Sequence, residues 1–151
     1  MNLIKLQDEI ANDEGIKYET YNCSEGHLTG GIGHLITEWD IEYYGKPIGT
    51  KVPNEQVNDW FENDIKVSIQ DCEEIFQSFN DLPEEIQRVL ANMSFQLGRP
   101  TLSKFKNMIA AVNNQDYQEM ANQMEDSRWY RQTPNRAQRL IDRVLTQGIP
   151  H

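Results

Sequence analysis

The sequence predicts an α+β protein that is mostly helical. A glycine-rich run of β-favouring residues lies between Ile16 and about Ile36. A long stretch with helical hydrophobic spacing follows it, and several shorter helical stretches come after that. The β signal and the helical signals occupy separate parts of the chain, which is the pattern of an α+β protein rather than of alternating βα units.

The N-terminal third predicts one short helix and a small sheet. Residues 2–12 have apolar side chains on one helical face. The run from residue 16 to residue 36 predicts two or three strands: a tight hairpin that turns at Asn22–Gly26, and then a strand that carries Thr29. Residues 37–52 form a glycine-punctuated connection with little regular signal, so we expect at most one helical turn there.

The strongest helical signal covers residues 54–79, with Pro53 and Asn54 at its start. Four further helices are predicted over residues 84–98, 105–112, 116–127 and 135–147, and residues 148–151 are expected to be a loose tail. The long helix carries a stripe of apolar side chains at helical spacing: Val57, Trp60, Phe61, Ile65, Ile69, Cys72, Phe76 and Phe79.

Composition and charge exclude several classes of function. The chain has 151 residues and a net charge of −10, which argues against binding to nucleic acid phosphates. No run approaches the ~18 apolar residues of a membrane span, and the first ten residues lack the apolar segment of a secretory signal. The spacing of cysteines and histidines matches no metal site, so we expect no metal and no cofactor. Two cysteines, Cys23 and Cys72, are expected to be free thiols.

Glu14 is the first candidate for chemistry. It lies in the last turn of the first predicted helix, beside Gly15, which is expected to end that helix. A carboxylate there faces the negative end of the helix dipole, which costs up to about 1 kcal/mol. Folding gains nothing from this position, whereas a proton donor does. The alternative is an ordinary solvated glutamate.

Three blocks carry a resemblance to a known family. The first joins Asp13-Glu14-Gly15 to the runs Tyr21–Gly26 and Thr29-Gly-Gly-Ile-Gly-His34. The others are Asn92–Gly98 and Ser127–Arg139. Together they resemble the phage-type lysozymes of glycoside hydrolase family 24, in the family's order and over most of the chain.

The resemblance implies a lysozyme-like fold with two lobes in one domain, residues 1–151. The N-terminal lobe would cover residues 13–53 and contain the hairpin. A connecting helix would cover residues 54–79. The C-terminal lobe would cover residues 80–151 and include the first helix, residues 2–12.

The resemblance also implies a catalytic set of Glu14, Cys23 and Thr29. Glu14 would be the general acid, and the other two would hold a water for attack on the opposite face of the sugar, which is an inverting geometry. Most members of the family have an aspartate where this chain has Cys23, although some carry cysteine. A neutral thiol is a poor base, so a working Cys23 would have to ionise, and the nearby Glu25 opposes that. The alternatives are a passive turn residue and, less expected, covalent catalysis through the thiol.

Supporting residues follow from the same resemblance. Arg136 would pair with Glu14; the alternative is a surface cation near a helix start. His34 would pair with Asp64, which falls on the apolar stripe of the long helix and needs a partner there; a neutral histidine bonded to backbone is the alternative. A further ion pair would join Asp13 to Arg139, and the substrate would contact Leu35, Asn92, Phe95 and Gln96 in a cleft between the lobes.

The implied activity is muramidase: hydrolysis of the β-1,4 bond between N-acetylmuramic acid and N-acetylglucosamine in peptidoglycan. The implied setting is a phage-infected host, with the protein made in the cytoplasm as a monomer and reaching the periplasm and wall through a holin. Two alternatives stay open: a glycan-binding or virion-associated module with weakened catalysis, and a lytic transglycosylase or chitin-active enzyme. The acidic charge is unexpected for a protein that meets anionic bacterial walls.

Overall fold

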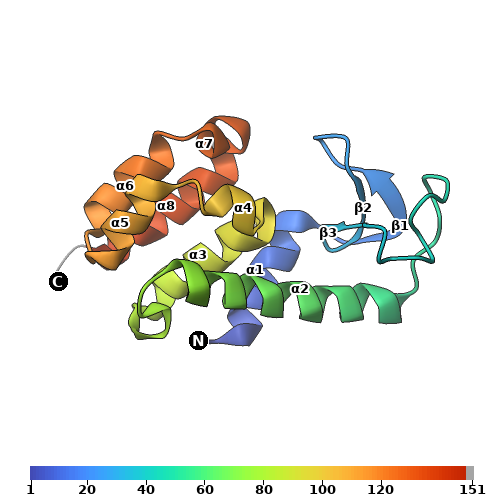
Figure 1. The fold of residues 1–151 in the computed structure, drawn as a ribbon, viewed down its shortest axis with the longest axis horizontal. Coiled ribbons are helices and arrows are strands. Elements are labelled where there is room, and N and C mark those ends of the chain that lie inside the picture. The colour runs from blue at the N-terminus through green and yellow to red at the C-terminus, as the bar shows by residue number, and fades with distance from the viewer. Residues whose placement is uncertain (149–151) are drawn as a thin grey trace. The chain divides into compact units, whose positions relative to one another are not determined.

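The computed structural model describes residues 1–148 (Figure 1). They form eight α-helices, one 3-10 helix and three short strands, so the prediction of a mostly helical α+β protein is confirmed. None of these helices is both long enough and apolar enough to cross a bilayer. In chain order the elements are α1 (Leu3–Glu14), β1 (Lys17–Asn22), β2 (Leu28–Gly31), β3 (His34–Leu35), α2 (Asn54–Ile75), the 3-10 helix η1 (Phe79–Asp81), α3 (Glu84–Leu97), α4 (Arg99–Leu102), α5 (Lys106–Asn113), α6 (Tyr117–Glu125), α7 (Arg128–Gln132) and α8 (Pro134–Gly148).

The chain divides into two compact units. One unit is Gln7–Val67, which contains the sheet; the other combines Met1–Leu6 with the chain from Ser68 onward. Helices α1 and α2 each contribute residues to both units. The division into lobes implied by the family stays a prediction.

The unit of residues 7–67 is built on an antiparallel sheet in the order β1-β2-β3 (Figure 1). Thr29 on the middle strand pairs with Tyr21 on one side and with Leu35 on the other. Two glycines of β2 allow the sheet to lie close to Trp60 of α2, because a Cβ at Gly30 would come within 3.3 Å of the indole ring. The core of this unit consists of Ile32, Ile36, Tyr43, Val52, Val57 and Trp60.

The connection after β3 is a series of turns, as its sequence predicts. The Thr20 hydroxyl accepts hydrogen bonds from the amides of Gly49 and Thr50, each at 3.1 Å. The amide of Val52 donates to the carbonyl of Tyr18 at 2.8 Å. These bonds fix the end of the connection to β1, so irregular backbone is still tightly held.

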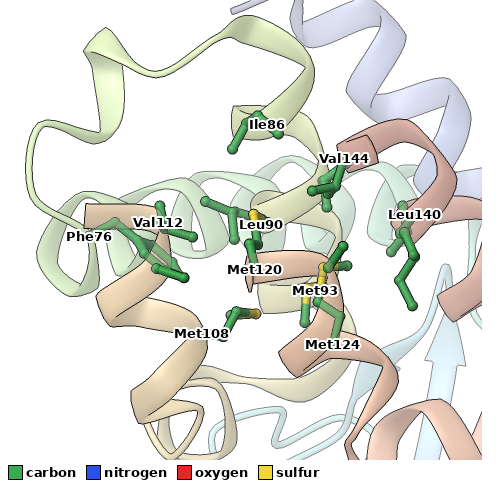
Figure 2. Close-up of a cluster of buried hydrophobic side chains, with 14 of the residues drawn as sticks. Phe76, Ile86, Leu90, Met93, Met108, Val112, Met120, Met124, Leu140 and Val144 are labelled. Carbon is green, nitrogen blue, oxygen red and sulfur yellow. The ribbon is translucent and has the colours of Figure 1, made fainter. Parts of the chain in front are cut away.

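The other unit has a methionine-rich hydrophobic core, drawn in Figure 2. Helix α3 is almost fully buried in its middle turns, and it packs against α8. Helix α6 contacts both α5 and α8. The labelled core side chains are Phe76, Ile86, Leu90, Met93, Met108, Val112, Met120, Met124, Leu140 and Val144.

The long helix is shorter than predicted. Helix α2 ends at Ile75, and Ser78 adopts a left-handed backbone with φ of +51°. Phe76 and Phe79 nevertheless remain buried, because the chain bends so that both rings still reach the core. The helical spacing of apolar residues therefore continues beyond the last helical turn, and this is why the predicted helix extended to residue 79. The amide of Gln77 donates to Asn113 Oδ1 at 3.0 Å.

Other helix ends agree more closely with their sequence signals. Asp116 caps α6 by accepting a hydrogen bond from the amide of Glu119, and Ser127 caps α7 by accepting one from Tyr130. The four-residue helix α4 was not predicted, since so short a segment shows no periodicity.

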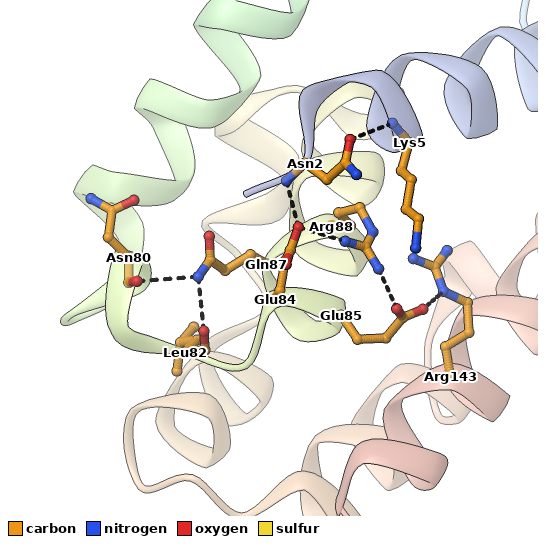
Figure 3. Close-up of polar contacts among 9 residues, drawn as sticks. All are labelled: Asn2, Lys5, Asn80, Leu82, Glu84, Glu85, Gln87, Arg88 and Arg143. Carbon is orange, nitrogen blue, oxygen red and sulfur yellow. Dashed lines mark hydrogen bonds and ion pairs between the residues drawn. The ribbon is translucent and has the colours of Figure 1, made fainter.

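A charged network ties the start of α3 to α8 (Figure 3). Glu85 contacts both Arg88 and Arg143, while Arg88 also donates to Glu84 at 2.9 Å. Burial raises the pKa of Glu85, but its pairs with Arg143 and Arg88 outweigh burial and hold that pKa below its usual range. The amide of Asn2 also donates to the Glu84 carboxylate.

Candidate active site

Glu14 is the last residue of α1, as predicted. The helix ends because Gly15 has φ of +73°, and the amide of Gly15 donates to the carbonyl of Ala11 at 2.9 Å. The half-buried Glu14 side chain lies against the turn between β2 and β3. A Cβ built on Gly33 would stand 2.5 Å from Glu14 Oε1, so only glycine leaves room for this carboxylate.

Cys23 lies at the entry of the hairpin turn between β1 and β2. Its amide donates to the carbonyl of His27, and its carbonyl accepts from the amide of Gly26, both at 2.9 Å. Gly26 has φ of +82°, which closes the turn. These bonds hold Cys23 near the start of β2, where Thr29 is buried at the centre of the sheet.

The surroundings of Cys23 make its thiol easier to ionise. Burial raises its pKa, but hydrogen bonds from the backbone of His27 and Glu25 and from the Thr29 hydroxyl outweigh burial and lower it. The Glu25 carboxylate acts in the opposite sense and has the smallest effect of these. The charge of Glu25, which opposes ionisation of Cys23, can be read from the sequence. The backbone hydrogen-bond donors, whose effect on the pKa is larger, cannot be read from it.

The Thr29 hydroxyl has one proton and two acceptors within reach. It donates to the carbonyl of His27 at 2.9 Å, and it also contacts the Cys23 sulfur. A hydroxyl can donate to only one of them at a time. Thr29 can therefore follow the charge of Cys23, donating to the sulfur when that is a thiolate.

Tyr21 lies close to two predicted catalytic residues, although it was not predicted as a site residue. Burial raises the pKa of its hydroxyl, and the negative charges of Glu14 and Cys23 raise it further. The charges of both predicted catalytic groups thus help to keep the phenol protonated, so it can donate a hydrogen bond. The hairpin predicted from sequence could have indicated Tyr21, because it pairs with Thr29 across β1 and β2.

His34 is held between two carboxylates. Its Nδ1 lies 2.7 Å from Asp64 Oδ2, the partner that the resemblance implies, and its Nε2 lies 3.1 Å from Asp40 Oδ2. The imidazole also stacks on Trp60, with ring centres 4.2 Å apart. Burial lowers the pKa of His34, but the two carboxylates outweigh burial and raise it. Asp40 was not anticipated, because only the fold of the turn around Thr37 brings it there.

Arg136 is held by Asn92 within the other unit. Asn92 Oδ1 accepts hydrogen bonds from Nε and Nη2 of Arg136, at 3.0 and 2.7 Å. Asn92 is fully buried, so the expectation that it lines the substrate surface is corrected: it can support Arg136 but has no exposed face for a sugar. Gln96 is half-buried and accepts from Trp129 Nε1 at 2.9 Å.

The remaining predicted residues differ in exposure. Leu35 on β3 is half-exposed and open to a ligand, whereas Phe95 on α3 is partly buried. The ion pairs of Glu14 with Arg136 and of Asp13 with Arg139 stay predictions. Both cysteines are free thiols, and burial raises the pKa of Cys72 to about 12, so it is inert at neutral pH.

Comparison with known proteins agrees with the motifs. The family model described as phage lysozyme matches residues 11–145. A probable T4-type lysozyme of Dictyostelium discoideum is 34% identical over 90% of this chain and 91% of its own length.

Two phage proteins are similar over almost the whole of this chain but are much longer. The pre-baseplate central spike protein Gp5 of Enterobacteria phage T4 is 28% identical over 97% of this chain and 28% of its own. The peptidoglycan hydrolase gp36 of Pseudomonas phage phiKMV is 26% identical over 95% of this chain and 15% of its own length. With the family model covering residues from α1 to α8, the chain belongs to the phage lysozyme family.

Proposed function

We propose that the protein is a muramidase that hydrolyses the β-1,4 bond between N-acetylmuramic acid and N-acetylglucosamine in peptidoglycan. The observation that carries this proposal is that Glu14 lies against the turn between β2 and β3, at Gly33. In the same sheet, Thr29 contacts the Cys23 sulfur and pairs with Tyr21. Membership of the phage lysozyme family and the likeness to a protein named as a peptidoglycan hydrolase support it.

In the proposed reaction, Glu14 donates its proton to the glycosidic oxygen as the bond to the anomeric carbon breaks. The Cys23 thiolate and the Thr29 hydroxyl hold a water that attacks the opposite face of the sugar, and the water's proton passes to the thiolate. The product then has inverted configuration at the anomeric carbon. The lowered pKa of Cys23 supports its role as the base, because this thiol ionises more readily than an ordinary cysteine does.

The test is clearing of purified cell walls by the full chain and by Glu14→Gln. We expect the variant to lose at least about a hundredfold in rate, the scale of a general acid. Glu62→Gln on the exposed face of α2 makes the same charge change elsewhere and should clear walls at the rate of the unchanged protein. Equal clearing with and without the Glu14 carboxylate would refute the hydrolase proposal.

Product analysis separates the related activities. Reducing ends with inverted configuration at the anomeric carbon support the inverting hydrolase, while anhydromuramic ends would show a lytic transglycosylase. Cleavage of chitin but not of walls would point to a chitin-active enzyme.

The proposed biological role is host lysis, with the monomer acting on wall glycan after release from the cytoplasm by a holin. Expression with and without a holin tests this, because lysis that is independent of the holin would contradict it. The likeness to a central spike protein favours a virion-associated module as the second candidate. Detection of the chain in purified virions would support that candidate.

A further inference from the structure

The connection between β3 and α2 exposes large apolar side chains. Trp39 is 84% exposed and Ile41 79%, and Tyr44 is more than half exposed. The other two tryptophans, Trp60 and Trp129, are buried. Three large exposed apolar side chains within residues 39–44 are more than the scattered single ones of an ordinary surface, and they suggest an interaction site.

The segment is held from within. Tyr43 is buried and meets Trp60 edge-on, with ring centres 5.1 Å apart. The Asp40 carboxylate accepts from the amide of Thr37 at 2.9 Å and bonds to His34. The carbonyl of Asp40 accepts from the amides of Tyr43 and Tyr44. Trp39 is thus displayed on fixed backbone, which reduces the entropy lost when a ligand binds.

The charge of the segment indicates what would bind. Glu38 and Glu42 are exposed, and neither forms a hydrogen bond or an ion pair with any residue among 1–148. Asp40, between them, is already bonded to His34. Two exposed carboxylates within four residues of an exposed indole in the sequence are complementary to a cation that also has an apolar face.

We propose that Glu38, Trp39, Glu42 and Tyr44 form a binding surface for a β-1,4 amino-sugar strand that carries free ammonium groups. The C–H face of a sugar ring would stack on the Trp39 indole, and the ammonium would meet the ring electrons and the two carboxylates. This inference rests on the proposed function, because it gives the same glycan polymer a second contact and favours strands that have lost acetyl groups. Such strands would also attract, rather than repel, a chain of net charge −10.

The test is binding of a glucosamine hexamer and of an N-acetylglucosamine hexamer to the full chain carrying Glu14→Gln, which cannot turn over. Calorimetry gives the affinity, and acrylamide quenching reports on Trp39 as the exposed tryptophan. We expect the glucosamine hexamer to protect Trp39 from quenching and to bind about tenfold more tightly than the acetylated one, a difference of ~1.4 kcal/mol.

Variants separate the parts of the surface. Trp39→Ala should weaken binding of the glucosamine hexamer by about tenfold. Glu38→Gln with Glu42→Gln should weaken it at low salt and have little effect at about 1 M salt. Ile4→Ala removes another strongly exposed apolar side chain, 71% exposed, from α1 and should bind like the unchanged protein.

Three outcomes would overturn the inference: unchanged affinity in Trp39→Ala, equal affinity for the two hexamers, or loss in Trp39→Ala of binding to phospholipid vesicles instead. Wall clearing by the chain with Glu14 intact is measured separately on fully acetylated walls, where Ile4→Ala should act at the normal rate. If the glucosamine hexamer fails to bind, the binding surface is refuted and the proposed wall hydrolysis is not. If the protein fails to clear walls, the proposed hydrolysis is refuted and the binding measurement is not.

Discussion

The contact between His34 and Asp40 gives the sharpest test of the electrostatics of the sheet-bearing unit. Only a protonated imidazole has an N–H on both ring nitrogens, so only that form can donate to Asp64 and to Asp40 together. The raised pKa of His34 means that the folded protein binds this proton more tightly than the unfolded chain does. The resulting stability is fully present below the unfolded pKa of about 6.5 and is lost as pH rises through the folded pKa.

The perturbation is Asp40→Asn, which keeps the shape of the side chain and removes its charge. A hydrogen bond between charged groups contributes about 1.5–3 kcal/mol when it is well shielded from water. The Asp40 side chain is 15% exposed and its bond to His34 is 3.1 Å long, so screening reduces the effect. We expect the variant to lose about 1–2 kcal/mol of unfolding free energy at about pH 5.5, and less than half of that at about pH 9.

The measurement is urea unfolding at both pH values, followed by circular dichroism, together with an NMR titration of the His34 ring. The folded pKa of His34 should fall in Asp40→Asn. Asp64→Asn should have the larger effect, since its contact is shorter, at 2.7 Å. A loss of stability in Asp40→Asn that is the same at both pH values, or an unchanged pKa of His34, would refute the reasoning.

Three further predictions test other contacts. Cys23 should react with iodoacetamide at a lower pH than an ordinary cysteine does, because its pKa is lowered, and its alkylation should stop wall clearing; activity that survives in both the alkylated protein and Cys23→Ser would show that the thiol is passive. Gly33→Ala should reduce wall clearing at least tenfold by displacing Glu14, even where circular dichroism shows a folded protein; full activity would contradict the close packing. Glu85→Gln should lower the free energy of unfolding at neutral pH, because it removes the charged pairs of Glu85 with Arg143 and Arg88. The difference between variant and unchanged protein should vanish as pH falls through the lowered pKa of Glu85, since the pairs exist only above that value. Urea unfolding over an acid pH series measures this difference, and a constant difference would refute the prediction.

The parts of the fold that could be predicted from sequence are those with local causes. Gly15 ends α1 and places Glu14 at its last turn, and the turn after Asn22 begins where its polar residues predict. The end of α2 could not be predicted in the same way. Phe79 is buried and fits the helical spacing, although it lies in a separate 3-10 turn. Hydrophobic periodicity indicates which side chains are buried, not which backbone conformation they have.

The candidate site shows the same limit. Glu14, Cys23 and Thr29 could be named from their motif, but the ionisation of Cys23 depends on backbone amides that become donors only once the hairpin has formed. Asp40 lies outside the motifs, and the turn after β3 brings it to His34. Asn92 has an ordinary place on a helix, and its burial against Arg136 depends on how α3 meets α8.

The methionines of the core have a consequence for the protein's lifetime outside a cell. Met93, Met108, Met120 and Met124 are at most 1% exposed, so oxidants cannot reach their sulfurs while the chain is folded. Once the chain opens, each thioether can become a sulfoxide, which is polar and does not fit a dry interior. A molecule that unfolds in oxidising surroundings would therefore be unable to return, and its working life there would be set by how rarely it opens.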